Sequence, residues 1–499
     1  MPGSLSPAHR PAPARCVLGK AGLAVVLPVA LMLGTTGCVG EAGSADRPTP
    51  QASRKDDAWE AKLEYLADVA QSPQPEDSPN IVIVQYDDLG LGDLGFSGSS
   101  AIQTPTIDGF AANGVVLTNY HAPAAVCSPS RAGLLTGRLG PVAGVPDVLF
   151  PSPPATEPAS SPASQPGLPR SEITMAEILQ ARGYDTSMVG KWHLGDTEGS
   201  LPNDAGFDSF VGSLYSNDMD PFRIYRDREV MIETVDQTTL DDLYTDEAVK
   251  VIESAASADD PFFLYFAHNF PHEPLAVAQR NIGRSDAGAY GDVVEGLDDG
   301  FARIMDALEA GSATDDTIVI LTSDNGPWYQ GSAGGLRGRK GSINEGGQRV
   351  PFVISWPEGI EGGRSLDTMV MGTDVLPTIL DWLGLEAPTD RHIDGSSMAP
   401  LLAGERDSVS QFYYYFAGQQ LLAVSDGRYK YYARQPYLYV TSGKDGGYPS
   451  DQGPWLFDLK SDPQESYDVL GLYPQIGAQL AAELERRAAQ QTANPRGWS

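Results

Sequence analysis

The chain has 499 residues, 41% of them hydrophobic, and is long enough to bury a large core in more than one domain. Acidic residues outnumber basic ones 66 to 34, and the net charge of −32 disfavours nucleic acid as a partner, because phosphate binding needs a basic surface. Three cysteines, Cys16, Cys38 and Cys127, are too few for a disulfide framework to hold the fold together.

The first 37 residues are typical of an export signal. Basic residues up to Lys20 precede the apolar run Ala21–Leu33, which is long enough for the core of a signal peptide and too short to span a bilayer. The cysteine that follows, Cys38, resembles the lipidated residue of bacterial lipoproteins, with Thr35 in place of the usual aliphatic residue. We therefore expect an exported protein with a lipid anchor in the cell envelope; the alternative is an ordinary signal peptide and a periplasmic or secreted protein.

Two segments are predicted to lack regular structure. Residues 38–76 are rich in Ala, Pro, Ser and charged residues, a composition typical of a flexible linker. Residues Pro151–Pro169 are rich in Pro, Ser and Ala and are expected to form a surface loop.

Two β-branched runs end in acidic residues. Asn80–Tyr86 stops at Asp87–Asp88, and Thr317–Ser323 stops at Asp324–Asn325. Ligands of open α/β sheets bind beyond the carboxyl ends of the strands, so these side chains are expected to face one crevice. Converging carboxylates repel unless a cation lies among them, and oxygen ligands favour calcium or magnesium over zinc or copper. A single Asp at a strand end is more often a turn or a helix cap; two matching sites favour the metal.

Helix and strand patterns alternate along residues 77–404. Thr174–Glu177 has the spacing of a capping box, and apolar residues recur at helical spacing between Val293 and Leu308. Further strands are predicted at residues 185–189, 261–267 and 351–355. This order predicts an α/β catalytic domain with a large, mostly parallel sheet covered by helices.

The character of the sequence changes after Gly404. Aromatic runs at residues 411–416, 421–424, 428–432 and 455–457 are separated by Gly and Asp turns, which indicates a small antiparallel sheet. An amphipathic helix at residues 474–489 is expected to pack against it. Residues 405–499 are therefore predicted to form an α+β subdomain.

Cys127 stands at the start of the segment VCSPSRAGLLTGR. Pro129 suits the first turn of a helix, so the cysteine lies at a helix N-terminus, which favours an anion. Arg131, about one turn further on, can reach back toward the same point. A lone cysteine would more often be a small buried hydrophobe.

The segment Cys127–Arg138 resembles the signature of the type I sulfatases, C-x-P-S-R followed by x-x-L-L-T-G-R. The resemblance extends from Asn80 to about Val469 through the segments Gly190–Gly195, Phe270–Pro274, Lys340–Pro351 and Leu456–Pro463. It implies an alkaline phosphatase-like fold. It also implies that a maturation enzyme oxidises Cys127 to formylglycine, whose hydrate attacks the sulfur of a sulfate monoester.

The resemblance also implies the roles of the site residues. A calcium ion, with magnesium less favoured, would be held by Asp87, Asp88, Asp324, Asn325 and the modified Cys127. Arg131 would stabilise the hydrate, and Lys191 and His193 would contact the hydrate and the sulfate. His272 and Lys340 would bind the sulfate on the leaving-group side; the Pro-His-x-Pro context favours His272 over the neighbouring His268.

A finer resemblance lies in Gly206–Asp218, which is similar to the arylsulfatase A and N-acetylgalactosamine-6-sulfatase branch. It implies that Ser216 contacts the sulfate, with Asn217 in place of the histidine usual there. The negative charge disfavours a densely sulfated polymer, which leaves an aryl or single-site carbohydrate sulfate as the expected substrate. Two alternatives remain: a formylglycine-dependent phosphodiesterase or phosphonate monoester hydrolase, and a non-catalytic surface lipoprotein whose Cys127 stays a thiol.

Overall fold

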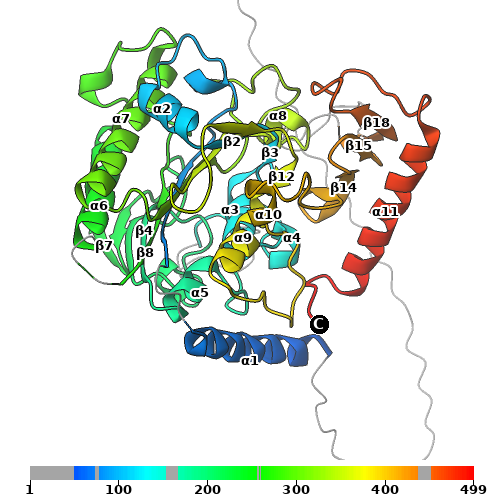
Figure 1. Ribbon diagram of the computed structural model, residues 1–499, viewed down its shortest axis with the longest axis horizontal. Helices are drawn as coiled ribbons and strands as arrows, with labels where there is room; N and C mark the ends of the chain where they lie inside the picture. Colours follow the sequence, from blue (N-terminus) through cyan, green and yellow to red (C-terminus); the bar gives the residue numbers. More distant parts are fainter. Residues whose placement is uncertain (1–49, 74–77, 153–166, 256–257, 259, 437–450) are drawn as a thin grey trace, which may run out of the picture. The chain divides into compact units, whose positions relative to one another are not determined.

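The computed structural model describes residues 50–73, 78–152, 167–255, 258, 260–436 and 451–499 (Figure 1). The predicted signal peptide, Cys38 and most of the loop Pro151–Pro169 lie outside the described residues. Residues 49–499 form one compact unit, and it alone is treated below. No helix in the described part of the chain is both long and apolar enough to cross a membrane.

A ten-stranded sheet forms the centre of this unit. Its order is β11-β2-β10-β9-β1-β8-β4-β5-β6-β7. The five strands from β9 to β5 pair in parallel, whereas β10 runs antiparallel to β9 and β2. The strands are β1 (Asn80–Tyr86), β2 (Val115–Leu117), β4 (Asp185–Lys191), β5 (Ser209–Ser213), β6 (Ile224–Arg226), β7 (Glu229–Ile232), β8 (Phe262–Ala267), β9 (Thr317–Ser323), β10 (Phe352–Ser355) and β11 (Arg364–Leu366).

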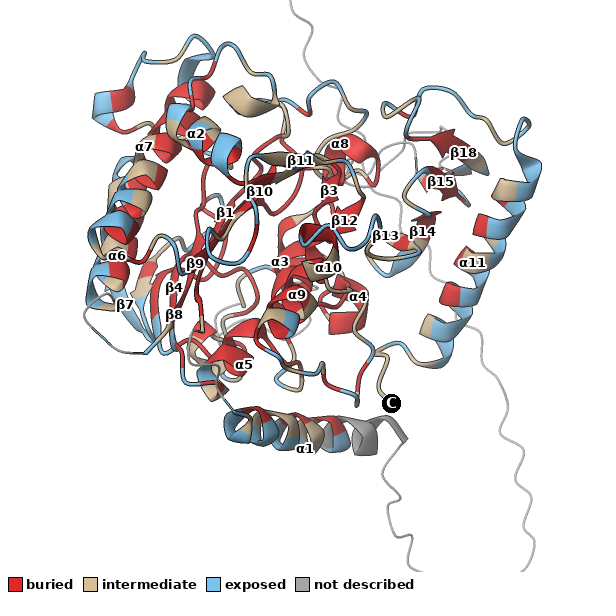
Figure 2. Ribbon diagram, in the orientation of Figure 1, coloured by how far each residue is buried: buried red, intermediate tan, exposed pale blue. Residues whose placement is uncertain are grey.

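Helices cover both faces of the sheet, and alternate residues of the strands face opposite layers. Val82 and Val84 of β1 belong to the core under α2 (Pro105–Asn113), α6 (Leu240–Ala255) and α7 (Gly288–Ala310). Ile81 and Ile83 belong to the other core, which also holds α3 (Cys127–Thr136), α4 (Gly140–Ala143), α5 (Met175–Ala181), α9 (Val375–Trp382) and α10 (Ala399–Leu402). Figure 2 shows the central strands buried between these layers. The predicted α/β architecture is therefore confirmed.

Local sequence signals account for several element boundaries. At the start of α5, Thr174 Oγ1 accepts a hydrogen bond from the backbone N–H of Glu177 (3.1 Å), and Glu177 Oε2 accepts one from the backbone N–H of Thr174 (3.0 Å). This is the reciprocal capping box that the sequence predicts. Two short strands, β3 (Tyr120–His121) and β12 (Val370–Met371), pair beside α8 (Glu345–Gln348), next to the large sheet.

The C-terminal subdomain contains a four-stranded antiparallel sheet in the order β13-β14-β15-β18. Its strands are β13 (Tyr413–Ala417), β14 (Gln420–Ser425), β15 (Tyr429–Tyr432) and β18 (Trp455–Asp458), and a short pair, β16 (Gln435–Pro436) and β17 (Asp451–Gln452), lies between the last two in the chain. Leu480 and Leu484 of α11 (Pro474–Ala493) pack on Val424 and Leu456 of this sheet. The predicted antiparallel sheet with a closing helix is present.

The prediction of a flexible linker over residues 38–76 is wrong for the helix α1 (Pro50–Gln71). Ala58, Lys62 and Val69 are buried at helical spacing, which gives α1 an inward face despite its polar composition. The ammonium group of Lys62 donates to the carbonyl of Glu172 (2.7 Å) and forms an ion pair with Glu177 of α5. These contacts attach the helix to the catalytic domain.

We predict that Lys62→Met lowers the free energy of unfolding by about 3 kcal/mol, because the carboxylate of Glu177 then lies buried without its partner. Glu60→Met is the matched control, since Glu60 is exposed on the same helix, and it should change stability by less than about 0.5 kcal/mol. Thermal unfolding of the two variants and the wild type checks this. Equal melting temperatures would mean that the contacts of Lys62 do not contribute to stability.

Candidate active site

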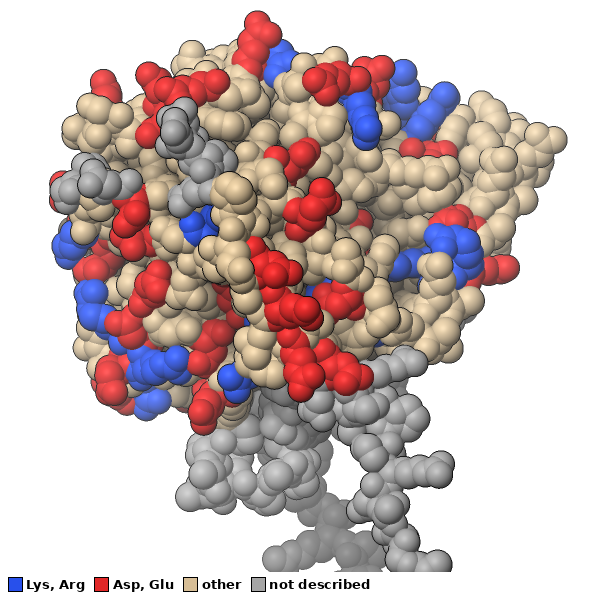
Figure 3. Space-filling view, turned by 60° about the horizontal axis from the view of Figure 1, so that its bottom comes forward, with Lys and Arg blue, Asp and Glu red and all other residues tan. Residues whose placement is uncertain are grey.

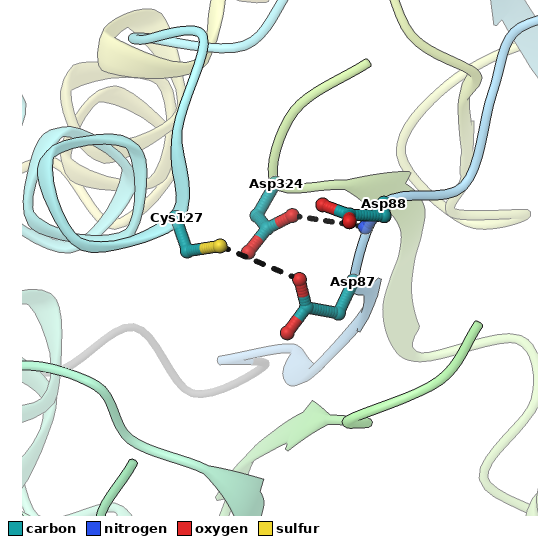
Figure 4. A group of neighbouring side chains, drawn as sticks. All are labelled: Asp87, Asp88, Cys127 and Asp324. Carbon is teal, nitrogen blue, oxygen red and sulfur yellow. Dashed lines mark hydrogen bonds between the residues drawn. The ribbon is translucent and has the colours of Figure 1, made fainter. Parts of the chain in front are cut away.

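Four side chains from three elements meet at the carboxyl edge of the parallel strands (Figure 4). Asp87 and Asp88 follow β1, Asp324 follows the adjacent strand β9, and Cys127 begins α3. One ligand atom from each residue lies within 4.8 Å of the others, and all four residues are buried. Cys127 Sγ is 3.5 Å from Asp87 Oδ1, and the backbone N–H of Asp88 donates to Asp324 Oδ1 (3.3 Å). The parallel register of β1 and β9 thus brings together the acidic residues that the sequence singled out.

Asn325 adds a fifth group to this cluster. Its amide nitrogen donates to Asp88 Oδ1 (2.6 Å) and to the carbonyl of Gly326 (3.0 Å). These two bonds fix the amide so that Oδ1 points elsewhere. That oxygen is buried and accepts no hydrogen bond from the residues that the structure describes. A buried acceptor without a donor is costly, so this oxygen is available to a cation.

Three basic side chains neutralise the carboxylates. Arg131 donates from Nε to Asp324 Oδ2 (2.9 Å) and from Nη1 to the carbonyl of Lys191 (2.6 Å). The ammonium group of Lys191 forms an ion pair with Asp87 and donates to Ser216 Oγ (3.2 Å). Lys340 Nζ lies 2.8 Å from Asp88 Oδ1. The predicted residues Arg131, Lys191, Ser216 and Lys340 therefore surround the cluster.

The pKa values of the buried groups reflect this balance of charge. Burial alone would raise the pKa of Asp87, but Lys191, His272 and Arg131 outweigh it and hold the pKa well below its usual range. Burial and the charge of Asp87 raise the pKa of Asp324. Burial and Asp87 also raise the pKa of the Cys127 thiol far above its usual range. An unmodified Cys127 is thus a neutral thiol and a poor nucleophile.

His193 has a buried ring nitrogen that carries a free lone pair. Its Nε2 lies 3.0 Å from the carbonyl oxygen of Leu149, which can only accept, so Nε2 carries the proton and Nδ1 the lone pair. Nδ1 is buried and has no hydrogen-bond partner in the described part of the chain. Burial, with the charges of Lys191 and Arg131, holds the pKa of His193 well below its usual range. The ring is therefore neutral at neutral pH.

The structure separates the two candidate histidines after β8. His272 Nε2 lies 3.8 Å from Asp88 Oδ2, at the edge of the cluster, and the His272 side chain is 13% exposed. His268 is fully buried and packs against the rings of Tyr244 and Phe270. Its burial lowers its pKa to about 3. His268 is thus a core residue, and His272 is the histidine at the site.

Backbone strain coincides with the site. Asp88 and His193 have φ angles of 64° and 60°, in the left-handed region that non-glycine residues rarely adopt. Such residues persist where the surrounding structure holds them, and they concentrate at functional sites. The sequence carries no signal for this feature.

A buried charge network that the sequence does not reveal lies between β15 and the catalytic domain. Lys430 of β15 lies 2.9 Å from Glu345 Oε1 and 3.4 Å from Glu465 Oε1, and all three side chains are fully buried. Glu345 also lies 2.9 Å from His121 Nε2. The partners are far apart in the chain, so no local motif could have revealed them. The network joins the C-terminal sheet to the catalytic domain.

A cavity of about 490 Å³ opens beside Lys340. Its wall combines residues of the catalytic domain, among them Trp328, Tyr329 and Arg339, with Gln435 and Trp455 of the C-terminal subdomain. Asp and Glu side chains are spread over the face shown in Figure 3, in keeping with the net charge of −32. The described residues that line the cavity, in contrast, include three basic side chains and no acidic one. The cavity is therefore locally positive beside Lys340.

Comparison with known proteins gives a consistent family. The profile of the sulfatase family matches residues 79–385, and that of the C-terminal part of N-sulphoglucosamine sulphohydrolase matches residues 339–492. Arylsulfatase A of Homo sapiens is 34% identical over 436 residues, 79% of this chain and 83% of the relative. N-acetylgalactosamine-6-sulfatase of Mus musculus is 35% identical over 384 residues, 72% of each chain.

A solved structure supports the same family. The PsFucS1 sulfatase from Pseudoalteromonas sp. has a TM-score of 0.73 to this chain at 25% identity, and the match covers 90% of this chain and 96% of that one. The resemblance found in the sequence is therefore confirmed, and so is the alkaline phosphatase-like fold that it implied. The chain belongs to the sulfatase family and is a sulfuric ester hydrolase.

Proposed function

We propose that the protein hydrolyses sulfate monoesters through a formylglycine made from Cys127, with a calcium ion held by Asp87, Asp88, Asp324, Asn325 and the modified residue. The observation that carries this proposal is the convergence of four ligand atoms within 4.8 Å, in a setting where the thiol itself is unreactive. Oxidation of Cys127 would replace a neutral thiol with an oxygen centre beside the carboxylates. That step requires a maturation enzyme and an external oxidant, and the thiol sulfur leaves the residue as the aldehyde forms.

The donor set fits a calcium ion. Three carboxylates and one amide supply only hard oxygen atoms, which suit calcium and magnesium. The unpartnered Oδ1 of Asn325 and the raised pKa of Asp324 are both expected where a cation completes the charge balance. With the ion bound, the hydrated aldehyde supplies a nucleophilic hydroxyl, and the ion neutralises charge on the sulfate oxygens.

Residues of the chain bind the sulfate and transfer protons. Arg131 orients the carboxylate of Asp324 through its Nε, and the ammonium group of Lys191 lies between Asp87 and Ser216, where it can bind a sulfate oxygen. Nδ1 of His193 is the free lone pair that can take a proton when sulfate is released. Together these groups would hold the sulfate and regenerate the site.

His272 and Lys340 lie on the side of the leaving alcohol. His272 and Lys340 are both 13% exposed, whereas the side chains of Asp87, Arg131 and Lys191 are fully buried. We therefore place the approach of the substrate beside these two residues. Either one can donate a proton to the departing alcohol.

The substrate is proposed to be an aryl or single-site carbohydrate sulfate. The two relatives at 34% and 35% identity are named for aryl sulfate and N-acetylgalactosamine 6-sulfate. The locally positive cavity would attract one sulfate group despite the overall negative charge. A long, densely sulfated chain would extend over the acidic surface and be repelled.

We also propose export and a lipid anchor at Cys38, from the sequence of the first 38 residues. Mass spectrometry of the N-terminal peptide from the membrane fraction tests this. A diacylglycerol adduct on Cys38 is expected, and a free N-terminus elsewhere in a soluble fraction would contradict it.

Mass spectrometry of the peptide that contains Cys127, taken from the native host, should show the aldehyde in place of the thiol. Cys127→Ala should abolish turnover of 4-nitrophenyl sulfate, because the proposed nucleophile is made from the side chain of Cys127. Ser130→Ala, in the same helix, is the control for folding. A thiol at position 127 in fully active protein would contradict the proposal.

Removal of calcium with a chelator should abolish activity and lower the melting temperature, because Asp87, Asp88 and Asp324 then repel one another. Calcium at a hundredfold excess over Kd should restore about 2.7 kcal/mol of stability. Asn325→Ala should require more calcium for the same stabilisation, whereas Asn203→Ala, outside the cluster, should behave as wild type. If the chelator changes neither the activity nor the melting temperature, the metal site is ruled out.

A further inference from the structure

One residue that lines the 490 Å³ cavity, Gln435, has a buried side-chain oxygen without a hydrogen-bond partner among the described residues. Gln435 of β16 is 8% exposed and lines the cavity together with Lys340. Its amide nitrogen donates to Asn344 Oδ1. Its amide oxygen, Oε1, is buried and accepts no hydrogen bond from the described residues. A buried acceptor of this kind indicates a missing donor.

The buried charge network fixes which end of Gln435 is the acceptor. Glu465 Oε2 accepts hydrogen bonds from the backbone N–H of Glu345 (2.9 Å) and from Asn344 Nδ2 (2.9 Å). Asn344 must therefore present Oδ1 in the other direction, where it also accepts a bond from Ser342 Oγ (2.8 Å). Gln435 can satisfy that oxygen only with its amide nitrogen.

The hydrogen bonds between these residues therefore have a fixed donor and a fixed acceptor. Lys430 forms an ion pair with Glu465, and Glu465 accepts a hydrogen bond from the amide nitrogen of Asn344. The amide oxygen of Asn344 in turn accepts a hydrogen bond from the amide nitrogen of Gln435. The direction of these hydrogen bonds is fixed, because the ammonium group of Lys430 and the backbone N–H of Glu345 can only donate. The free oxygen of Gln435 is an acceptor that the fold holds in place.

We propose that Gln435 is a specificity-determining residue: its Oε1 accepts a hydrogen bond from a hydroxyl or amide N–H of the substrate's alcohol, and so selects a sulfated saccharide over a simple aryl sulfate. This inference rests on the proposed function, which places the leaving alcohol beside Lys340. Asn344 is a positioning residue, since it acts through Gln435.

The rest of the cavity suits a saccharide. Its volume lies within the range of small-molecule sites. Trp328 and Trp455 are half-buried and offer apolar surfaces on which a sugar ring can lie, and Tyr329, which is 67% exposed, extends the same wall. A saccharide carries hydroxyl groups around its ring that can donate a hydrogen bond to Gln435 Oε1. A simple aryl sulfate has no such donor.

The test compares kcat/KM of the matured enzyme for 4-nitrophenyl sulfate with those for the 6-sulfates of galactose, glucose, N-acetylgalactosamine and N-acetylglucosamine. Gln435→Leu and Gln435→Met both remove the acceptor, and Met keeps the length of the side chain. Loss of one neutral hydrogen bond should lower kcat/KM for the best hexose sulfate about tenfold. The value for 4-nitrophenyl sulfate should change less than about twofold.

Gln420→Leu is the matched control, because Gln420 is exposed on β14 and its amide oxygen bonds Arg434 outside the cavity. It should leave both classes of substrate unchanged. An equal loss for both classes in the Gln435 variants, or no loss, would overturn the inference, as would hydrolysis of 4-nitrophenyl sulfate without turnover of any hexose sulfate. If protein with the aldehyde at position 127 hydrolyses neither class, the proposed function fails instead.

Discussion

The structure depends on one electrostatic constraint, which is that three carboxylates lie buried within a few ångströms of one another. Asp87, Asp88 and Asp324 would force the site apart if they faced only each other. Each has a basic partner from elsewhere in the fold, namely Lys191, Lys340 and Arg131. The ionic contacts connect the loops after β1 and β9 with the end of β4 and with α3, so the charge balance of the site also fixes its geometry.

The same arrangement explains why the site is so deeply buried. A parallel sheet covered on both faces can present side chains only beyond its strand ends, and the loops there fold over the cluster. The fully buried Arg131 and Lys191 have little freedom to move, which preorganises them for a charged group. Among the described side chains of the site, those of His272 and Lys340 are partly exposed.

Much of the fold and of the candidate site could be predicted from the sequence, because the sequence signals were local. Asn80–Tyr86 and Thr317–Ser323 coincide with β1 and β9, and the acidic residues after them converge as expected. Composition was misleading for α1, whose buried face depends on Lys62 contacts that only the folded chain provides. The pairing of Lys430 with Glu345 and the left-handed backbone of Asp88 depend on distant segments, and no pattern of neighbouring residues encodes them.

The buried link between Lys430, Glu345 and Glu465 has a consequence for how the enzyme works. Opening the C-terminal sheet away from the catalytic domain would separate unlike charges in a dry interior, which costs several kcal/mol. The described strands of the C-terminal sheet are therefore held firmly against the catalytic domain. The wall of the 490 Å³ cavity, to which both parts contribute residues, therefore keeps a fixed shape.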